Sequence, residues 1–113
     1  MQDFEKLLQT PLRAMTVDAF SSNIDSYQDN INVLTLIAEY GNKETINKLC
    51  QIIANKLTSG KYKEGVSLID KLHLCDIKDI NMLVSIIETL GESALSEDER
   101  ASVLQRLKSL KIN

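Results

Sequence analysis

His73 and Cys75 are the side chains that first suggest a reactive site, because a cysteine and a histidine can act as nucleophile and base. Such a pair also needs a third group that orients the base, and the sequence offers no candidate for that role. We expect Cys75 to pack as a small hydrophobic side chain and His73 to lie partly solvated near a helix end. The sequence therefore predicts no catalytic residues and no enzymatic activity.

Metal and cofactor chemistry is also poorly represented in the sequence. His73, Cys75 and Cys50 would lack a fourth ligand, and their spacing matches no zinc pattern. Two cysteines are too few for a disulfide framework. Gly60-Lys61 lacks the upstream glycine of a phosphate-binding loop, and no acidic run has the form of a calcium loop. We therefore predict no metal and no cofactor.

The charge distribution argues against a nucleic-acid partner. The net charge is −3, and acidic and basic residues are interspersed along the chain. Nucleic-acid-binding domains usually concentrate Lys and Arg on one face. The locally basic segment from Arg106 to Lys111 is explained by the favourable effect of cations near a helix C-terminus. A small regulator that docks the helix at 76–90 on nucleic acid remains a competing hypothesis.

The apolar residues recur at three- and four-residue spacing, which is typical of amphipathic helices. We predict an all-α fold of six or seven short antiparallel helices, arranged as a bundle or as a short right-handed solenoid. Asn42 should cap one helix, and Ser96 with Glu99 should form a capping box at the start of the last. Gly41 should end a helix by adopting a positive φ. The predicted helical segments are 2–9, 11–20, 24–40, 43–58, 62–73, 77–90 and 97–110.

No stretch has the composition of a linker, so we expect a single helical domain over residues 1–113. The N-terminus lacks the basic and apolar regions of a secretory signal. No apolar run approaches the length of about 20 residues that spans a bilayer. We therefore expect a cytoplasmic protein without a membrane partner.

A short internal sequence repeat links two of these predicted helices. Residues 46–53 recur as residues 80–87, 34 positions later, and between them Gly60, Tyr62, Gly65 and Ile69 form a glycine, aromatic, small and bulky pattern. This pattern resembles the second helix of a tetratricopeptide repeat, whose repeat length is also 34 residues. The resemblance covers about one and a half repeats over residues 46–110. It departs from the family pattern at positions such as Leu49, Lys56 and Ala101. It implies stacked antiparallel hairpins that bind a peptide or helix, as in many co-chaperones and secretion chaperones.

A second arrangement uses the same helices. The run from Val33 to Leu110 could form the six short antiparallel helices of a death-fold bundle, with Gly60 to Gly65 as a loosely formed third helix. The charged Arg-x-Asp-Leu element typical of death-effector relatives is missing, and the first 30 residues would be surplus. This alternative implies a signalling or assembly module.

Several apolar residues widen the hydrophobic arc beyond one side of their helices. They are Leu36, Ile37, Ile52, Leu68, Met82 and Ile86. Either the central helices are buried on both faces, or part of this surface is a partner or self-association patch. The second explanation predicts a non-enzymatic interaction module: an adaptor, chaperone or inhibitor that binds a peptide or helix in an apolar groove, or a homodimer. We place the groove at Asn47, Gln51, Asn81, Met82 and Ser85.

Overall fold

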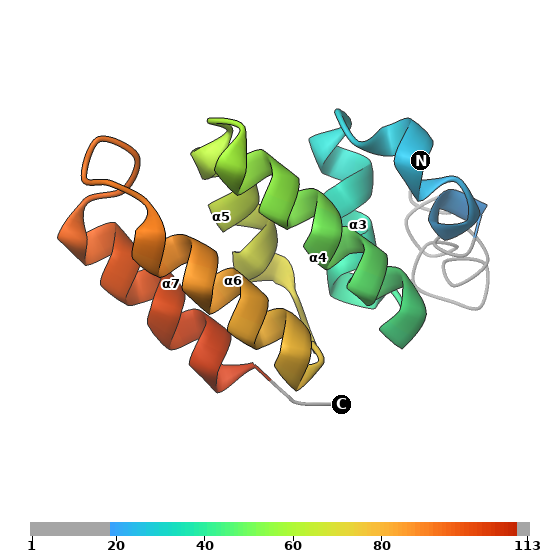
Figure 1. Cartoon of the computed structure of the whole chain (residues 1–113). Coiled ribbons are helices and arrows are strands. Elements are labelled where there is room, and N and C mark those ends of the chain that lie inside the picture. The colour runs from blue at the N-terminus through green and yellow to red at the C-terminus, as the bar shows by residue number, and fades with distance from the viewer. Residues whose placement is uncertain (1–18, 111–113) are drawn as a thin grey trace, which may run out of the picture.

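A computed structural model of the chain describes residues 19–110, and these are helical with no β-strand among them (Figure 1). Residues 19–22 are helical, and a short 3-10 helix, η1, follows them. The further helices are α3 (Ile31–Tyr40), α4 (Lys43–Thr58), α5 (Tyr62–Lys71), α6 (Ile77–Thr89) and α7 (Glu97–Ser109), and η1 spans Ile24–Tyr27. The predicted all-α class is confirmed. The predicted helix at 2–9 and most of that at 11–20 lie outside the described residues.

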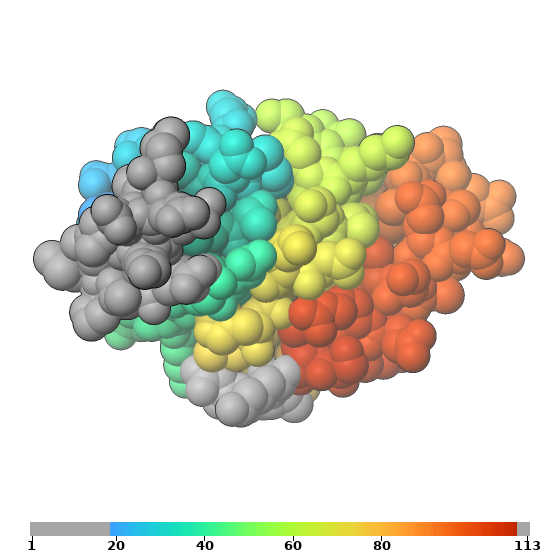
Figure 2. Space-filling view, turned by 180° about the vertical axis from the view of Figure 1, so that it is seen from behind, coloured from blue at the N-terminus to red at the C-terminus, as the bar shows by residue number. Residues whose placement is uncertain are grey.

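The α-helices form two layers, and consecutive helices alternate between the layers and run antiparallel to each other (Figure 1). Helices α4 and α6 run side by side and parallel in one layer, and α3, α5 and α7 lie behind them (Figure 1). From behind, α3, α5 and α7 follow one another across the surface in teal, yellow and red (Figure 2). The hairpins α4–α5 and α6–α7 are therefore stacked, and each helix buries its apolar stripe against the opposite layer.

The two copies of the sequence repeat, residues 46–53 and 80–87, lie at equivalent places in the fold. Helices α4 and α6 begin 34 residues apart, at Lys43 and Ile77. The repeated apolar positions share one environment, because Ile46 with Ile80, Leu49 with Leu83 and Ile53 with Ile87 are all buried.

The two helices differ on the flank that points away from η1. Ala54 follows Cys50 and Gln51 by one turn of α4, on the side facing α6, and it is buried. The equivalent residue of α6, 34 positions later, is Glu88, and it is exposed. At this one position α6 therefore carries an exposed charge where α4 carries a buried methyl group, while the equivalent pairs Asn47 with Asn81 and Gln51 with Ser85 are polar in both helices.

The starts of the helices agree with their predicted caps. The side chain of Asn42 accepts a hydrogen bond from the backbone of Thr45, and Ser96 and Glu99 form the reciprocal capping box. Gly41 ends α3 as predicted but not by the predicted mechanism, because its φ is −67°. The described glycine with positive φ is Gly60 (φ 92°), which closes the turn between α4 and α5.

One predicted helix is broken in the structure. The segment 24–40 was expected to be continuous, but η1 ends at Tyr27 and α3 begins at Ile31. The reason is Asn30, whose side chain accepts a hydrogen bond from the backbone of Val33 and so caps a new helix. The fifth helix also ends at Lys71, two residues earlier than predicted.

The core is aliphatic, as the composition predicts, and its buried side chains form one cluster from Ile24 to Leu110. The excess apolar surface is mostly covered by the opposite layer. Three of the residues in question are fully within the core and three are half-buried: Ile37, Ile52 and Leu68, then Leu36, Met82 and Ile86. Among the large hydrophobic side chains that the structure describes, only Tyr40 and Ile77 are exposed. Of the two explanations for the wide apolar arcs, burial within the layers therefore holds for the first three residues.

None of the helices in residues 19–110 combines the length and apolar character needed to cross a membrane.

Candidate functional site

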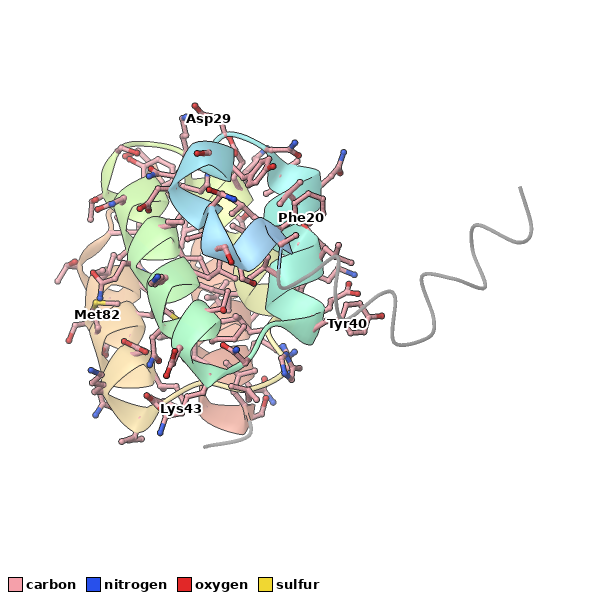
Figure 3. All side chains as sticks on the ribbon, turned by 90° about the vertical axis from the view of Figure 1, so that its right-hand side faces the viewer. Phe20, Asp29, Tyr40, Lys43 and Met82 are labelled. Atoms are coloured by element: carbon pink, nitrogen blue, oxygen red, sulfur yellow. The ribbon has the colours of Figure 1, made fainter. Side chains whose placement is uncertain are left out.

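The seam between α4 and α6 brings two of the predicted binding residues, Gln51 and Met82, into contact. Nε2 of Gln51 on α4 lies 3.7 Å from the thioether sulfur of Met82 on α6, within reach of a weak hydrogen bond. Figure 3 shows Met82 on α6, next to α4. Asn47 precedes Gln51 by one helical turn, and Ser85 follows Met82 by three residues. Asn81, next to Met82, is exposed on the same helix. Gln51 and Met82 are therefore in contact across the seam, and the other three residues lie within one helical turn of this contact.

The surface around this contact is polar apart from Met82. Gln51, Asn81 and Ser85 are exposed, while Asn47 and Met82 are half-buried. The side-chain oxygen of Asn47 is buried without a hydrogen-bond partner. The seam is therefore lined by carboxamides and one thioether, and it does not have the apolar lining that the sequence suggested.

Below the same seam, two cysteines and an aspartate form a buried cluster that we call the Cys-Cys-Asp cluster (Cys50, Cys75 and Asp79). The two sulfur atoms are 3.5 Å apart, and the ligand atoms of the three residues all lie within 4.8 Å of one another. The cysteines have no exposed surface, and Asp79 is only 3% exposed. One carboxylate oxygen of Asp79, Oδ2, has no hydrogen-bond partner.

Three separate segments position this cluster. Cys50 lies in the middle of α4, Cys75 in the connection between α5 and α6, and Asp79 in the first turn of α6. The place of Asp79 beside the cysteines was not predicted from the sequence. The four-residue spacing of Cys75 and Asp79 was a usable signal. Cys50 could not be added to it without knowing that α4 packs on α6.

The protonation equilibria of the cluster reflect its burial. The hydrogen bond with Cys75 and burial raise the pKa of the Cys50 thiol, and the carboxylates of Asp79 and Asp76 act in the same direction. The hydrogen bond from Cys50 lowers the pKa of Cys75 against the effect of burial. Burial raises the pKa of Asp79, and Lys78 partly opposes this. A nearby cation would stabilise the charged form of all three members of the cluster.

His73 does not join the cluster. Its side chain is exposed, and Nδ1 lies 2.9 Å from the backbone oxygen of Ala38 on α3. Cys75 instead contacts Cys50. The expected environments are confirmed for both residues, since Cys75 is buried and His73 is solvated. The pair that suggested nucleophilic chemistry is therefore directed to different partners.

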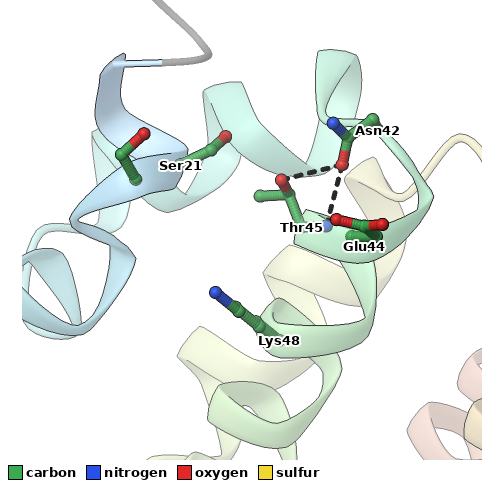
Figure 4. A pocket seen from close by; sticks show the side chains of 6 residues that line it. Ser21, Asn42, Glu44, Thr45 and Lys48 are labelled. Atoms are coloured by element: carbon green, nitrogen blue, oxygen red, sulfur yellow. Dashed lines mark hydrogen bonds between the residues drawn. The ribbon is translucent and has the colours of Figure 1, made fainter.

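A polar pocket of about 340 Å³ opens at the start of α4, lined by Ser21, Ser22, Asn42, Glu44, Thr45 and Lys48 (Figure 4). Oδ1 of Asn42 accepts hydrogen bonds from the backbone nitrogen and from the hydroxyl of Thr45, both at 2.9 Å. These bonds satisfy part of the donor capacity of the helix N-terminus from within the chain. Glu44 and Lys48 both line the pocket, so its lining carries charges of both signs and has no clear preference for an anion.

No protein-family model, curated protein or solved structure matches the chain. The resemblance to a tetratricopeptide repeat therefore stays a prediction from the sequence, and the function has to be argued from the geometry of the molecule.

Proposed function

We propose that the protein is a non-enzymatic adaptor that binds a segment of another protein on the exposed face of α4 and α6. The observation that carries this proposal is the contact between Gln51 and Met82, which joins the two helices into one continuous surface. Short turns and the shared core hold these helices together. A partner would therefore meet a rigid face that loses little conformational freedom on binding.

The side chains of this face suit the backbone of an extended peptide. A carboxamide offers both a donor and an acceptor, as does each peptide unit of a bound segment. Asn47, Gln51 and Asn81 supply three such groups, of which the last two are exposed. Met82 adds a flexible apolar contact that adapts to different side chains. We therefore favour recognition through backbone hydrogen bonds with one apolar contact over recognition in an apolar groove.

The charges on α6 give no support to a nucleic-acid partner. The exposed residues of α6 include Lys78 and Glu88, which are of opposite sign, and no cluster of basic residues accompanies them. Neutralisation of several phosphates would need such a cluster.

Site-specific photocrosslinking tests the proposed face. A photoreactive amino acid is placed at Gln51 or Ser85 on this face, and at Ser67 of α5 as a control in the opposite layer; all three positions are exposed. We expect one discrete crosslinked partner from positions 51 and 85 and none from position 67. Equal crosslinking from both layers, or none from a folded protein in its native extract, contradicts the proposal.

Once the partner is captured, its affinity gives a quantitative test. The double variant Gln51→Lys/Ser85→Lys should weaken binding by at least about tenfold, because it removes a hydrogen-bonding group and adds bulk and charge to the face. Ser67→Lys adds a similar charge to the other layer and should leave the affinity unchanged. An unchanged affinity in the double variant would place the partner elsewhere on the molecule.

A further inference from the structure

We propose that the Cys-Cys-Asp cluster binds one divalent transition-metal ion of the zinc class through the sulfurs of Cys50 and Cys75 and the carboxylate of Asp79. The inference concerns the interior of the molecule and does not rest on the proposed adaptor function. Nothing in the sequence analysis assigns a metal to these residues, which are brought together only by the packing of α4 on α6.

The distances in the cluster suit such an ion. Zinc binds thiolate sulfur at about 2.3 Å and carboxylate oxygen at about 2.0–2.2 Å, usually in tetrahedral geometry. Two thiolates on one tetrahedral ion are therefore about 3.8 Å apart. The sulfurs of Cys50 and Cys75 are 3.5 Å apart, and the Asp79 ligand atom lies within 4.8 Å of both. Coordination would require the two sulfurs to separate by about 0.3 Å and the Asp79 oxygen to lie about 3.5 Å from each of them.

The unpaired carboxylate of Asp79 independently indicates a cation. Its residue is 3% exposed, and its Oδ2 atom is buried with no donor. A buried carboxylate without a partner is costly, so such groups are normally paired or bound to metal. The ion pair beside the cluster does not supply a partner for Asp79, because Lys43 contacts Asp76 instead, with Nζ and Oδ1 3.7 Å apart. A metal ion would supply the missing partner.

The ligand types select the kind of metal. Two thiolates favour zinc and other thiophilic ions over magnesium and calcium, which prefer oxygen ligands. Binding would release one proton from each thiol, and a third from Asp79 in those molecules where it is protonated. The protein supplies three ligands, so one water would complete a tetrahedral site. Because the three ligands come from α4, α6 and the connection before α6, the bound ion would tie these segments together.

Cobalt(II) and zinc titrations of the full, reduced protein test this proposal. Cobalt bound by thiolates shows a sulfur-to-metal charge-transfer band and the intense visible bands of a tetrahedral site. We expect both features at one equivalent of cobalt, their loss when zinc displaces it, and the release of at least two protons per ion. Zinc should also raise the melting temperature, by an amount that grows with the logarithm of its free concentration.

Three variants and a matched control assign the ligands. Cys50→Ser and Cys75→Ser should abolish the charge-transfer band or reduce it and weaken zinc binding by at least about tenfold. Asp79→Asn should retain the band but weaken binding by about tenfold or more. Asp76→Asn makes the same charge change three residues earlier and keeps a good N-cap residue, so it should leave the affinity nearly unchanged. Circular dichroism identifies any variant that does not fold.

The wild-type cobalt spectrum tests the proposal even if every cysteine variant fails to fold. The absence of the thiolate band in reduced, folded wild-type protein overturns the proposal. So does zinc binding that persists in a folded Cys50→Ser/Cys75→Ser variant. If air oxidation forms the Cys50–Cys75 disulfide while the reduced protein takes up no ion, the two cysteines are a thiol pair and the metal site is refuted.

Discussion

The ammonium group of Lys56 lies 3.0 Å from Oε1 of Glu64 and joins α4 to α5, although only 5% of the Lys56 side chain is exposed. Glu64 remains accessible to solvent, with 41% of its side chain exposed. The ion pair is therefore asymmetric: the cation depends on its partner, and the anion does not.

This asymmetry predicts unequal effects of the two removals. Glu64→Gln leaves a buried ammonium without its counter-ion and should lower the free energy of unfolding by about 1–3 kcal/mol. Lys56→Met keeps most of the packed alkyl chain and leaves Glu64 hydrated, so it should cost less. Urea unfolding of the two variants measures the difference. If Lys56→Met lost as much stability as Glu64→Gln or more, the cost of leaving the buried Lys56 ammonium unpaired would not explain the effect.

Gly65 permits the close approach of α5 to α4. A Cβ atom at this position would lie 2.8 Å from Cδ2 and 3.0 Å from Cγ of Leu57, a residue with no exposed surface. Gly65→Ala should therefore lower stability by about 1–3 kcal/mol through overpacking, even though alanine favours the helix. Gly91→Ala is the control, because its nearest neighbour would be 3.8 Å away. Thermal unfolding should separate the two variants, and a stabilised Gly65→Ala would show that Leu57 can move.

Arg106 stabilises the end of a helix other than its own. Its Nη2 atom donates hydrogen bonds to the backbone oxygens of Asp70 at 3.1 Å and Leu72 at 2.8 Å, at the C-terminus of α5. Arg106→Leu should cost about 1.5–3 kcal/mol, because bonds from a charged donor are lost. Lys108→Leu alters the exposed surface of the same helix and should change stability by about 0.5 kcal/mol or less. Similar losses in both variants would assign the effect to general charge.

The stability of the metal-free protein should fall with increasing pH because of Asp79. Burial raises the pKa of this carboxyl above its ordinary value of 3.8, so the folded state holds its proton more firmly than the unfolded state. This contribution is complete below the ordinary pKa and is lost as the pH rises through the raised value. Asp79→Asn should abolish the decline and be more stable than the wild type at neutral pH.

This effect is measured by thermal unfolding of both proteins in the presence of a chelator, at pH values from the ordinary pKa of the carboxyl up to neutrality. The advantage of Asp79→Asn should disappear at the acidic end of the range. A variant that is less stable than the wild type at neutral pH would indicate that the carboxylate has a favourable partner. Added zinc should reverse the order of the two proteins, because only the wild type retains all three ligands.

The sequence predicted the fold better than it predicted the sites, and particular residues explain why. Helix starts depend on local bonds, so the caps at Asn42 and Ser96 could be located from the sequence. The cap at Asn30 was missed because the apolar spacing continues through it. Placing Cys50 beside Cys75 requires the packing of residues 25 positions apart, which no local pattern determines.

For the proposed binding face too, local features could be predicted from the sequence, whereas tertiary contacts could not. The recurrence of residues 46–53 as residues 80–87 correctly indicated that Asn47 and Asn81 belong to equivalent helices. The extent of burial could not be predicted in the same way, because Ile52 and Leu68 are covered by neighbours that are distant in the sequence.

The exposed carboxylate of Glu88, at the place where α4 has the buried Ala54, also affects how copies of the molecule can meet. Stacked-hairpin molecules with apolar ends can associate head to tail and grow into filaments. Growth through this flank would remove an unpaired negative charge from water, which is strongly unfavourable. An exposed charge at this position therefore disfavours end-to-end packing, and Glu88→Ala would give α6 the side chain that α4 buries at the equivalent position.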